Sequence, residues 1–251
     1  MSIIFFDTET TGIEEKDEVI QLAYIVSENG NKIPANKYYK PNTNISFGAM
    51  AVHHITPEKL KDNGAITSLT IEDELMQTLL TYNTPDNILV AHNIKFDLDM
   101  LERHGFKSNM RHIDTLRCSK HLLKAEGYSL GSLFYELGLY KKIKSLAESV
   151  GVDISKTISH DAMYDVIMLI LLTKALLSLD NINIDTLVEL TKKPVLIDVF
   201  TFGKYKGQKI EDIATQDKGY LNWMLDKMEN LDDDMRYTLS VRLNRITHEI
   251  Q

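Results

Sequence analysis

The sequence has a single cysteine, Cys118, among its 251 residues. One cysteine excludes an internal disulfide and any zinc site built from several thiolates. Long apolar runs are also missing, since no window approaches the ~18 uninterrupted apolar residues that a membrane span needs. The first residues carry neither the basic region nor the cleavage site of a secretory signal peptide. These absences predict a cytoplasmic protein without a membrane partner, in which Cys118 is a small helix residue rather than a nucleophile.

Positive charge is scarce as well, because 28 Lys and Arg stand against 36 Asp and Glu, for a net charge of −8. General nucleic-acid-binding proteins usually present a basic surface. An acidic chain that handles a polyanion would instead depend on bound divalent cations to attract phosphate. The hydrophobic content of 43% is that of a globular protein. The length allows one large domain, alone or with a small appendix.

The apolar pattern predicts an α/β fold: a mixed five-stranded sheet flanked by helices. Strands are expected over 3–6, 19–26, 32–40, 87–92 and 112–115. Helices are expected over 57–62, 71–82, 96–104, 116–124, 130–137 and 161–179. Asn29-Gly30 signals a hairpin turn, so the first three strands are read as antiparallel. The alternation of strand and helix after residue 86 predicts parallel strands.

Two polar segments, 180–183 and 192–194, predict a domain boundary. After it, the glycine- and lysine-rich segment 202–209 is typical of a tight hairpin. The helices expected beyond the hairpin cover 210–214, 219–227 and 233–246. The predicted domains are residues 1–180, a linker over 181–194, and a small C-terminal α+β domain over 195–251.

Asp7 and Glu9 directly follow the first apolar strand. Side chains at positions i and i+2 of a strand face the same side, so the two carboxylates project together. Two like charges beside a buried run are costly unless a cation lies between them. Mg²⁺ or Mn²⁺ suits such an all-oxygen site. The alternative is a solvated pair of acids at a strand end.

Further acids stand near the starts of two helices. Asp97 lies in the first turn of one helix, where it could simply interact with the helix dipole. Asp161 and Asp165 lie one turn apart on the long apolar helix, so geometry alone allows either to line a site. His160 precedes that helix and can turn toward the same centre, where nearby carboxylates would raise its pKa unless metals offset them.

Three segments resemble the three motifs of the DnaQ-like, or DEDD, exonuclease superfamily. They are Phe6-Asp7-Thr8-Glu9-Thr10-Thr11-Gly12, His92-Asn93 through Phe96-Asp97, and His160 through Asp165. The histidine subclass (DEDDh) places His five residues before the last Asp, as here, whereas the tyrosine subclass places Tyr four residues before it, where this sequence has Asp161. Residues 52–56 also resemble the family's linker element. The resemblance covers about residues 1–180 and implies a ribonuclease H-like fold.

This resemblance implies a two-metal 3′→5′ exonuclease that uses Mg²⁺, with Mn²⁺ as a substitute. Asp7, Glu9 and Asp165 would hold one ion, and Asp7 with Asp97, partly through water, the second. His160 would act as general base, a role worth ~10²–10⁴-fold in rate. The implied partners are DNA 3′ ends, single-stranded or frayed from a duplex, and the product is a nucleoside 5′-monophosphate.

Candidate substrate contacts come from the first two motifs. Thr8 and Gly12 would offer backbone contacts near the terminal sugar, and Ile13 would wedge against the last base. Phe96 would stack on a base or pack in the core, with neither favoured, and Asn93 is also assigned to substrate binding. Base stacking is sequence-tolerant, so little sequence preference is expected.

The tail favours DNA as substrate, because it resembles the tail of the exodeoxyribonuclease X family. The residues that carry this are Phe202 through Gly207, Gly219-Tyr220-Leu221, Trp223-Met224 and Tyr237-Thr238-Leu239. The alternatives are an exoribonuclease of the same superfamily, a polymerase-associated proofreading subunit, or a catalytically silent binding module. The intact set of five catalytic positions argues against the last. Strand preference and oligomeric state are left open.

Overall fold

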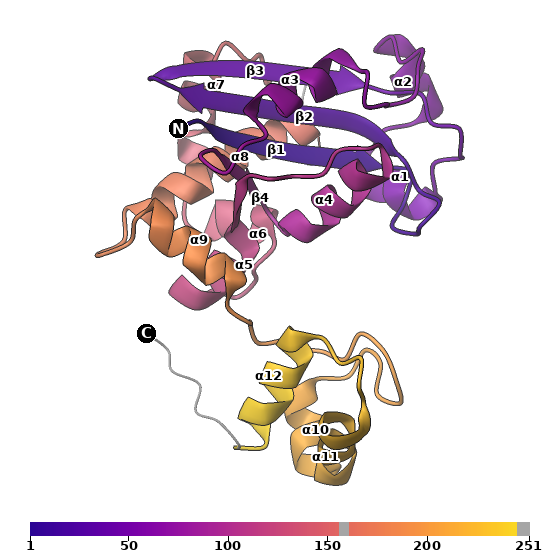
Figure 1. The fold of residues 1–251 in the computed structure, drawn as a ribbon, viewed down its shortest axis with the longest axis vertical. Helices are drawn as coiled ribbons and strands as arrows, with labels where there is room; N and C mark the ends of the chain where they lie inside the picture. Colours follow the sequence, from indigo (N-terminus) through magenta and orange to yellow (C-terminus); the bar gives the residue numbers. More distant parts are fainter. Residues whose placement is uncertain (156–160, 245–251) are drawn as a thin grey trace. The chain divides into compact units, whose positions relative to one another are not determined.

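The computed structural model describes residues 1–155 and 161–244, and its first part is built on a five-stranded mixed sheet (Figure 1). The strand order is β3-β2-β1-β4-β5. The strands are β1 (Ile3–Thr10), β2 (Val19–Glu28), β3 (Asn31–Tyr38), β4 (Ile88–Ala91) and β5 (Arg111–Asp114). β1 pairs antiparallel with β2 and parallel with β4. The expected α/β fold class is confirmed, and the Asn29-Gly30 turn has the positive φ angles that such a hairpin requires.

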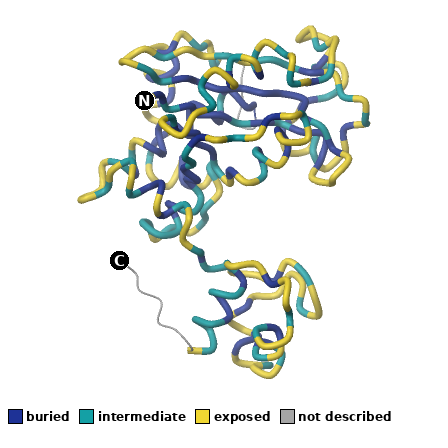
Figure 2. Tube along the Cα trace, viewed as in Figure 1, coloured by how far each residue is buried: buried dark blue, intermediate teal, exposed yellow. Residues whose placement is uncertain are grey.

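Helices cover both faces of this sheet. On one face, Phe6 and Leu22 share a buried core with Met76 of α3 (Glu74–Tyr82) and Leu101 of α4 (Ile94–Arg103). The other face is covered by α8 (Ala162–Leu177), whose first residue donates its amide proton to Gln21 Oε1 at 3.2 Å. Most side chains of α8 are buried, as expected of a helix that is apolar all round. The central strands consist mostly of buried residues (Figure 2).

Shorter helices lie between β3 and α8, and three of them were not expected from the sequence. The helices are α1 (Phe47–His53), α2 (Pro57–Asp62), α5 (Thr115–Leu122), α6 (Leu130–Glu136), the 3₁₀ helix η1 (Leu139–Lys141) and α7 (Ile143–Ser149). The unexpected ones are α1, η1 and α7. Only His53 of α1 is buried, so this helix has no apolar stripe to reveal it. It begins where Ser46 Oγ accepts the amide proton of Ala49.

The chain divides into two compact units, residues 1–118 with 125–191, and residues 119–124 with 192–251. The segment 181–194, expected to be a linker, is helical in α9 (Ile184–Lys192), because Leu187, Val188 and Leu190 form a buried stripe. The Cys118 thiol donates to the Leu187 carbonyl, which ties α9 to the first unit. The division into domains at 180 and 195 remains a prediction.

The second unit has an apolar core of its own, which includes Phe200, Met224 and Leu239. Its helices are α10 (Ile210–Gln216), α11 (Lys218–Lys227) and α12 (Asp233–Arg242). The loop over 202–209 is closed by one antiparallel bridge between Val199 and Lys209. Within residues 1–155 and 161–244, each helix is too short or too polar to cross a membrane.

Candidate active site

Three carboxylates from β1 and α8 converge on one place in the first unit. Asp7 and Glu9 face the side of the sheet on which α8 packs, since Glu9 lies opposite Gln21 and Gln21 binds the start of α8. Oxygens of Asp7, Glu9 and Asp165 all lie within 4.8 Å of one another. Carboxylate oxygens at this spacing suit a hard divalent cation such as Mg²⁺. The structure thus brings Asp165 together with two acids that precede it by 158 and 156 residues in sequence.

Asp97 is held in the same region by the strand that carries the first two acids. Thr8 lies between Asp7 and Glu9 and therefore points to the opposite side of the sheet, where α4 packs. Its amide and its hydroxyl donate to Asp97 Oδ1 at 3.1 and 2.7 Å. Asp97 is only 3% exposed, and its charge is the largest neighbouring-charge contribution that raises the pKa of Asp7. The four acids therefore form one electrostatic group.

Asp161 makes different contacts from Asp165, because it is the N-cap that precedes α8, whereas Asp165 lies within the helix. Its Oδ1 accepts the amide proton of Met163 at 3.2 Å, which caps α8. Its Oδ2 accepts the hydroxyl proton of Tyr38 at 2.7 Å. Asp161 thus fastens the start of α8 to β3, while Asp165 joins the three-carboxylate cluster.

The four acids repel one another in a poorly hydrated place. Burial, followed by the charges of Asp97, Asp165 and Glu9, raises the pKa of Asp7 well above 3.8. Burial and then Asp165 raise the pKa of Glu9 from 4.5 to about 9. Burial raises the pKa of Asp97 from 3.8 to about 7, although hydrogen bonds from Thr8 lower it. Divalent cations would offset this repulsion, so the donor set fits the metal that the sequence predicts.

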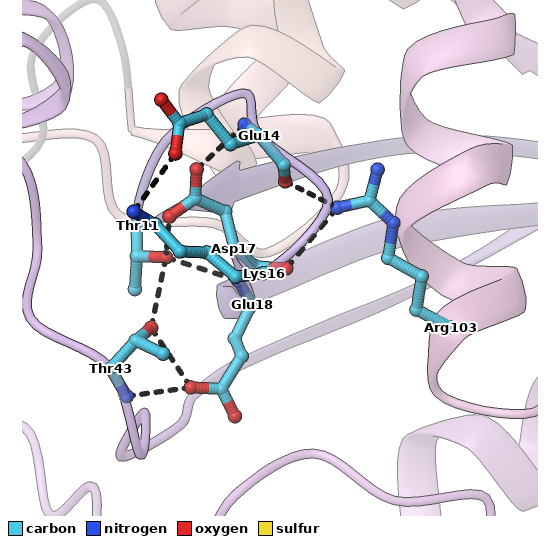
Figure 3. Close-up of polar contacts among 7 residues, drawn as sticks. All are labelled: Thr11, Glu14, Lys16, Asp17, Glu18, Thr43 and Arg103. Carbon is cyan, nitrogen blue, oxygen red and sulfur yellow. Dashed lines mark hydrogen bonds and ion pairs between the residues drawn. The ribbon is translucent and has the colours of Figure 1, made fainter.

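The loop that follows β1 is held by a buried carboxylate and by an arginine of α4 (Figure 3). Asp17 Oδ1 accepts the Thr11 hydroxyl at 2.8 Å, and its Oδ2 accepts the Glu14 amide at 2.7 Å. The Arg103 guanidinium donates to the carbonyl oxygens of Glu14 and Asp17 at 2.7 and 3.3 Å. A Cβ atom on Gly12 would lie 2.5 Å from Asp17 Oδ2, so this carboxylate occupies the space that a larger residue would need.

Glu18 ties the same loop to the segment after β3. Its carboxylate accepts the amide protons of Asn42 and Thr43 at 2.7 and 2.8 Å, and the Thr43 hydroxyl at 3.0 Å. Ile13 lies on this held loop with 83% of its surface exposed. The loop therefore presents a large apolar side chain to solvent just beyond the acid-bearing strand.

The other expected substrate contacts lie in varied settings. The Thr8 amide, expected near the terminal sugar, donates to Asp97 instead. Asn93 is exposed with left-handed backbone (φ 69°) at the start of α4. Phe96 is half-buried and packs against the core of that face, in line with the core alternative. His160 lies outside the described residues, and substrate contact by Thr8, Gly12, Ile13, Asn93 or Phe96 remains a prediction.

Sequence reasoning missed the residues that hold these elements in place. His53 is 2% exposed, and its Nδ1 accepts the amide proton of Ile55 at 2.9 Å. Because Nδ1 accepts this hydrogen bond, it carries no proton itself. Nε2 is therefore the nitrogen that donates, to the Thr10 carbonyl at 3.1 Å. Thr8, Asp17 and Arg103 likewise hold neighbouring segments in place through hydrogen bonds. Two of these residues had a signal in the sequence: Thr8 stands between two acids on a strand, and His53 falls within residues 52–56, which resemble the family's linker element.

The chain is similar to known exonucleases in sequence and in fold. A family model described as Exonuclease matches residues 4–173, and one described as Exodeoxyribonuclease X-like C-terminal matches residues 200–229. The chain is 28% identical to exodeoxyribonuclease 10 of Escherichia coli K12 over 236 residues, which are 93% of this chain and 94% of that protein. It is 31% identical over 147 residues to the PolC-type DNA polymerase III of Thermotoga maritima, covering 55% of this chain and 10% of that protein.

Among solved structures, exonuclease X in complex with 5′ overhanging duplex DNA matches with a TM-score of 0.53 at 22% identity. The match covers 75% of this chain and 99% of that chain. It confirms the ribonuclease H-like fold.

Proposed function

This chain belongs to the exonuclease family whose model matches residues 4–173, and on that premise we propose that it is a metal-dependent 3′→5′ exodeoxyribonuclease. The proposed substrate is a DNA 3′ end, and the product is a nucleoside 5′-monophosphate. The observation that carries the proposal is the meeting of Asp7, Glu9 and Asp165 oxygens within 4.8 Å. Similarity to an E. coli exodeoxyribonuclease along 93% of the chain favours DNA and a free-standing enzyme over an exoribonuclease or a proofreading subunit.

Each acid has a part in this proposal. When bound, two Mg²⁺ ions, for which Mn²⁺ can substitute, would supply Lewis-acid activation of water and stabilise the departing 3′ oxygen. Asp7, Glu9 and Asp165 would hold one ion, and Asp7 with Asp97 the other. Thr8 keeps Asp97 oriented through its two hydrogen bonds. His160 would accept the proton of the attacking water as general base.

The loop after β1 would meet the end of the substrate strand. Ile13 would pack against the terminal base, because its exposed side chain offers an apolar surface. Gly12 would let the backbone pass close to the terminal sugar. Asn93 and Phe96, at the start of α4, would line the approach to Asp97.

A digestion series tests this function. We would incubate 5′-labelled DNA and RNA oligonucleotides with Mg²⁺, Mn²⁺ or excess EDTA, using wild-type protein, Asp7→Ala and His160→Ala. Asp180→Ala, which removes an exposed acid beyond the other end of α8, is the matched control. The expected result is a ladder that shortens from the 3′ end of DNA with metal, for wild type and control only. Cleavage that persists in EDTA would contradict the proposal, and faster cleavage of RNA would favour the exoribonuclease.

A further inference from the structure

The first unit carries an exposed patch of tyrosines and lysines that has no part in the proposed catalytic mechanism. We define the tyrosine–lysine surface as Tyr135, Tyr140, Lys141, Lys142 and Lys144, all of which are exposed. Tyr135 and Tyr140 are 65% and 46% exposed, and their ring centroids lie 5.8 Å apart with the planes inclined by 38°. The Lys141 ammonium lies 5.6 Å from the centroid of the Tyr140 ring. Two large aromatic rings and several cations are thus offered together to solvent.

A buried aromatic ring links this surface to the acid-bearing part of α8. Phe134 is buried beneath the two tyrosines and meets their rings at centroid distances of 5.3 and 6.5 Å. Phe134 also meets the ring of Tyr164 at 6.4 Å. Tyr164 immediately precedes Asp165, which belongs to the three-carboxylate cluster. Two successive ring contacts thus connect the tyrosine–lysine surface with the residue that precedes Asp165.

The positive charge of the lysines and the exposure of the tyrosine rings together indicate what this surface binds. Three lysines fall within the four residues 141–144, although the chain as a whole has a net charge of −8. Proteins that bind single strands combine cations, which attract the phosphates, with aromatic faces on which the bases stack. We propose that the tyrosine–lysine surface binds the single strand of DNA that leads to the 3′ end. This inference rests on the proposed function and adds a second contact region to it.

A binding experiment on the full chain tests the proposal. The probe is a 5′-fluorescein oligothymidylate of about ten nucleotides, a length within the usual site size of such surfaces. Fluorescence anisotropy gives its Kd with Ca²⁺ in place of Mg²⁺, and a gel verifies that the strand stays intact. Tyr135→Ala with Tyr140→Ala removes stacking on two rings and should raise Kd about 30-fold or more. Tyr135→Phe with Tyr140→Phe should keep Kd near the wild-type value, because the rings remain.

Lysine variants test the electrostatic part. Lys141→Glu with Lys142→Glu should raise Kd and reduce the slope of log Kd against log salt by about 0.7 or more for each lysine. Lys107→Glu is the matched control, because this exposed lysine lies in the loop before β5. It should leave Kd within twofold. Binding of thymidine 5′-monophosphate in Ca²⁺ should be unchanged in all these variants, because a single nucleotide would contact only the cation-loaded acid cluster and the loop after β1.

The outcomes separate this inference from the proposed function. If the alanine and glutamate variants bind the oligonucleotide as wild type does, the tyrosine–lysine surface is not a strand-binding site, and a protein partner becomes the better explanation. Equal loss in the phenylalanine variants would also overturn the stacking argument. If the variants weaken binding as expected but wild-type protein shortens no strand in Mg²⁺, the surface stands and the exonuclease proposal fails. Thermal melting verifies that every variant is folded.

Discussion

Thr8 donates both its amide proton and its hydroxyl proton to one oxygen of Asp97, across 89 residues of sequence. The same strand turns Asp7 and Glu9 to the other side, where Asp165 lies. Alternation along β1 therefore joins α4 and α8 to a single group of acids. A substitution at Thr8 should therefore affect the acids on both faces of the sheet.

The Thr8 hydroxyl provides the first prediction. Thr8→Val keeps the side-chain shape but removes one donor to a carboxylate, a hydrogen bond of a kind worth ~1.5–3 kcal/mol. We expect about a tenfold loss of hydrolysis rate and a higher Mg²⁺ concentration for half-maximal rate. The measurement is the initial rate on labelled DNA across a Mg²⁺ series. Thr8→Ser, which retains the hydroxyl, should stay close to wild type, and an equal effect of both variants would refute the role of this bond.

Removing the charge of Asp165 and removing that of Asp161 should change the thermal stability of the protein in opposite directions. Asp165→Asn relieves repulsion in the acid cluster, so the Tm in EDTA should rise while the stabilisation by Mg²⁺ is lost. Asp161→Ala removes the cap of α8 and should destabilise the fold by about 0.5–2 kcal/mol while Mg²⁺ still stabilises it. Thermal melting with and without Mg²⁺ distinguishes the two. Loss of the Mg²⁺ response in Asp161→Ala would move Asp161 into the metal site.

The stability of the metal-free protein should fall as the pH rises. Glu9 has a pKa of about 9 in the folded chain against an ordinary 4.5, so the folded state binds more protons than the unfolded state between these values. Its contribution to stability is complete below pH 4.5 and is lost as the pH rises through about 9. Asp97 adds the same trend between 3.8 and about 7. Urea unfolding in EDTA across this pH range measures the effect.

Two comparisons check the cause of this pH dependence. Glu9→Gln cannot ionise, so its free energy of unfolding in EDTA should depend less on pH than that of the wild type. Mg²⁺ should flatten the wild-type curve as well, because a bound cation holds the carboxylates in their ionised form. A metal-free stability that rises with pH between 5 and 9 would show that burial and the neighbouring acids do not raise the pKa of Glu9.

Gly12 should not tolerate a methyl group. Gly12→Ala would place Cβ 2.5 Å from Asp17 Oδ2, so the carboxylate that holds the loop must move. We expect a loss of about 1–3 kcal/mol in stability, as for other overpacked sites, together with weaker substrate binding. Gly131→Ala is the control, because its added Cβ in helix α6 would meet no atom within 4 Å beyond the neighbouring backbone of that helix. That variant should gain about 0.4–1 kcal/mol, and a similar gain in Gly12→Ala would show that the loop readily adapts.

Elements with strong local signals could be predicted from the sequence. The helix over 57–62 has the expected bounds, because Thr56 caps it and Pro57 occupies its first turn. The Asn29-Gly30 turn has the expected position as well. In contrast, α1 and α9 were not predicted. Helix α1 has only one buried residue. The apolar stripe of α9 is short, and the polar residues around it indicated a linker. Short helices of this kind depend on the surfaces they pack against.

By itself, the sequence determined the kinds of elements and the three motifs that identify the family, since apolar periodicity and motif spacing are local properties of a chain. Spacing within the chain left both Asp161 and Asp165 open, and the motif resemblance favoured Asp165; the tertiary structure shows that Asp165 meets Asp7 and Glu9, whereas Asp161 caps α8 and binds Tyr38. The tertiary structure also decided that Asp97 is oriented by Thr8 from the opposite face of the sheet. Contacts between segments so distant in sequence depend on how helices pack across a sheet, which no local pattern records.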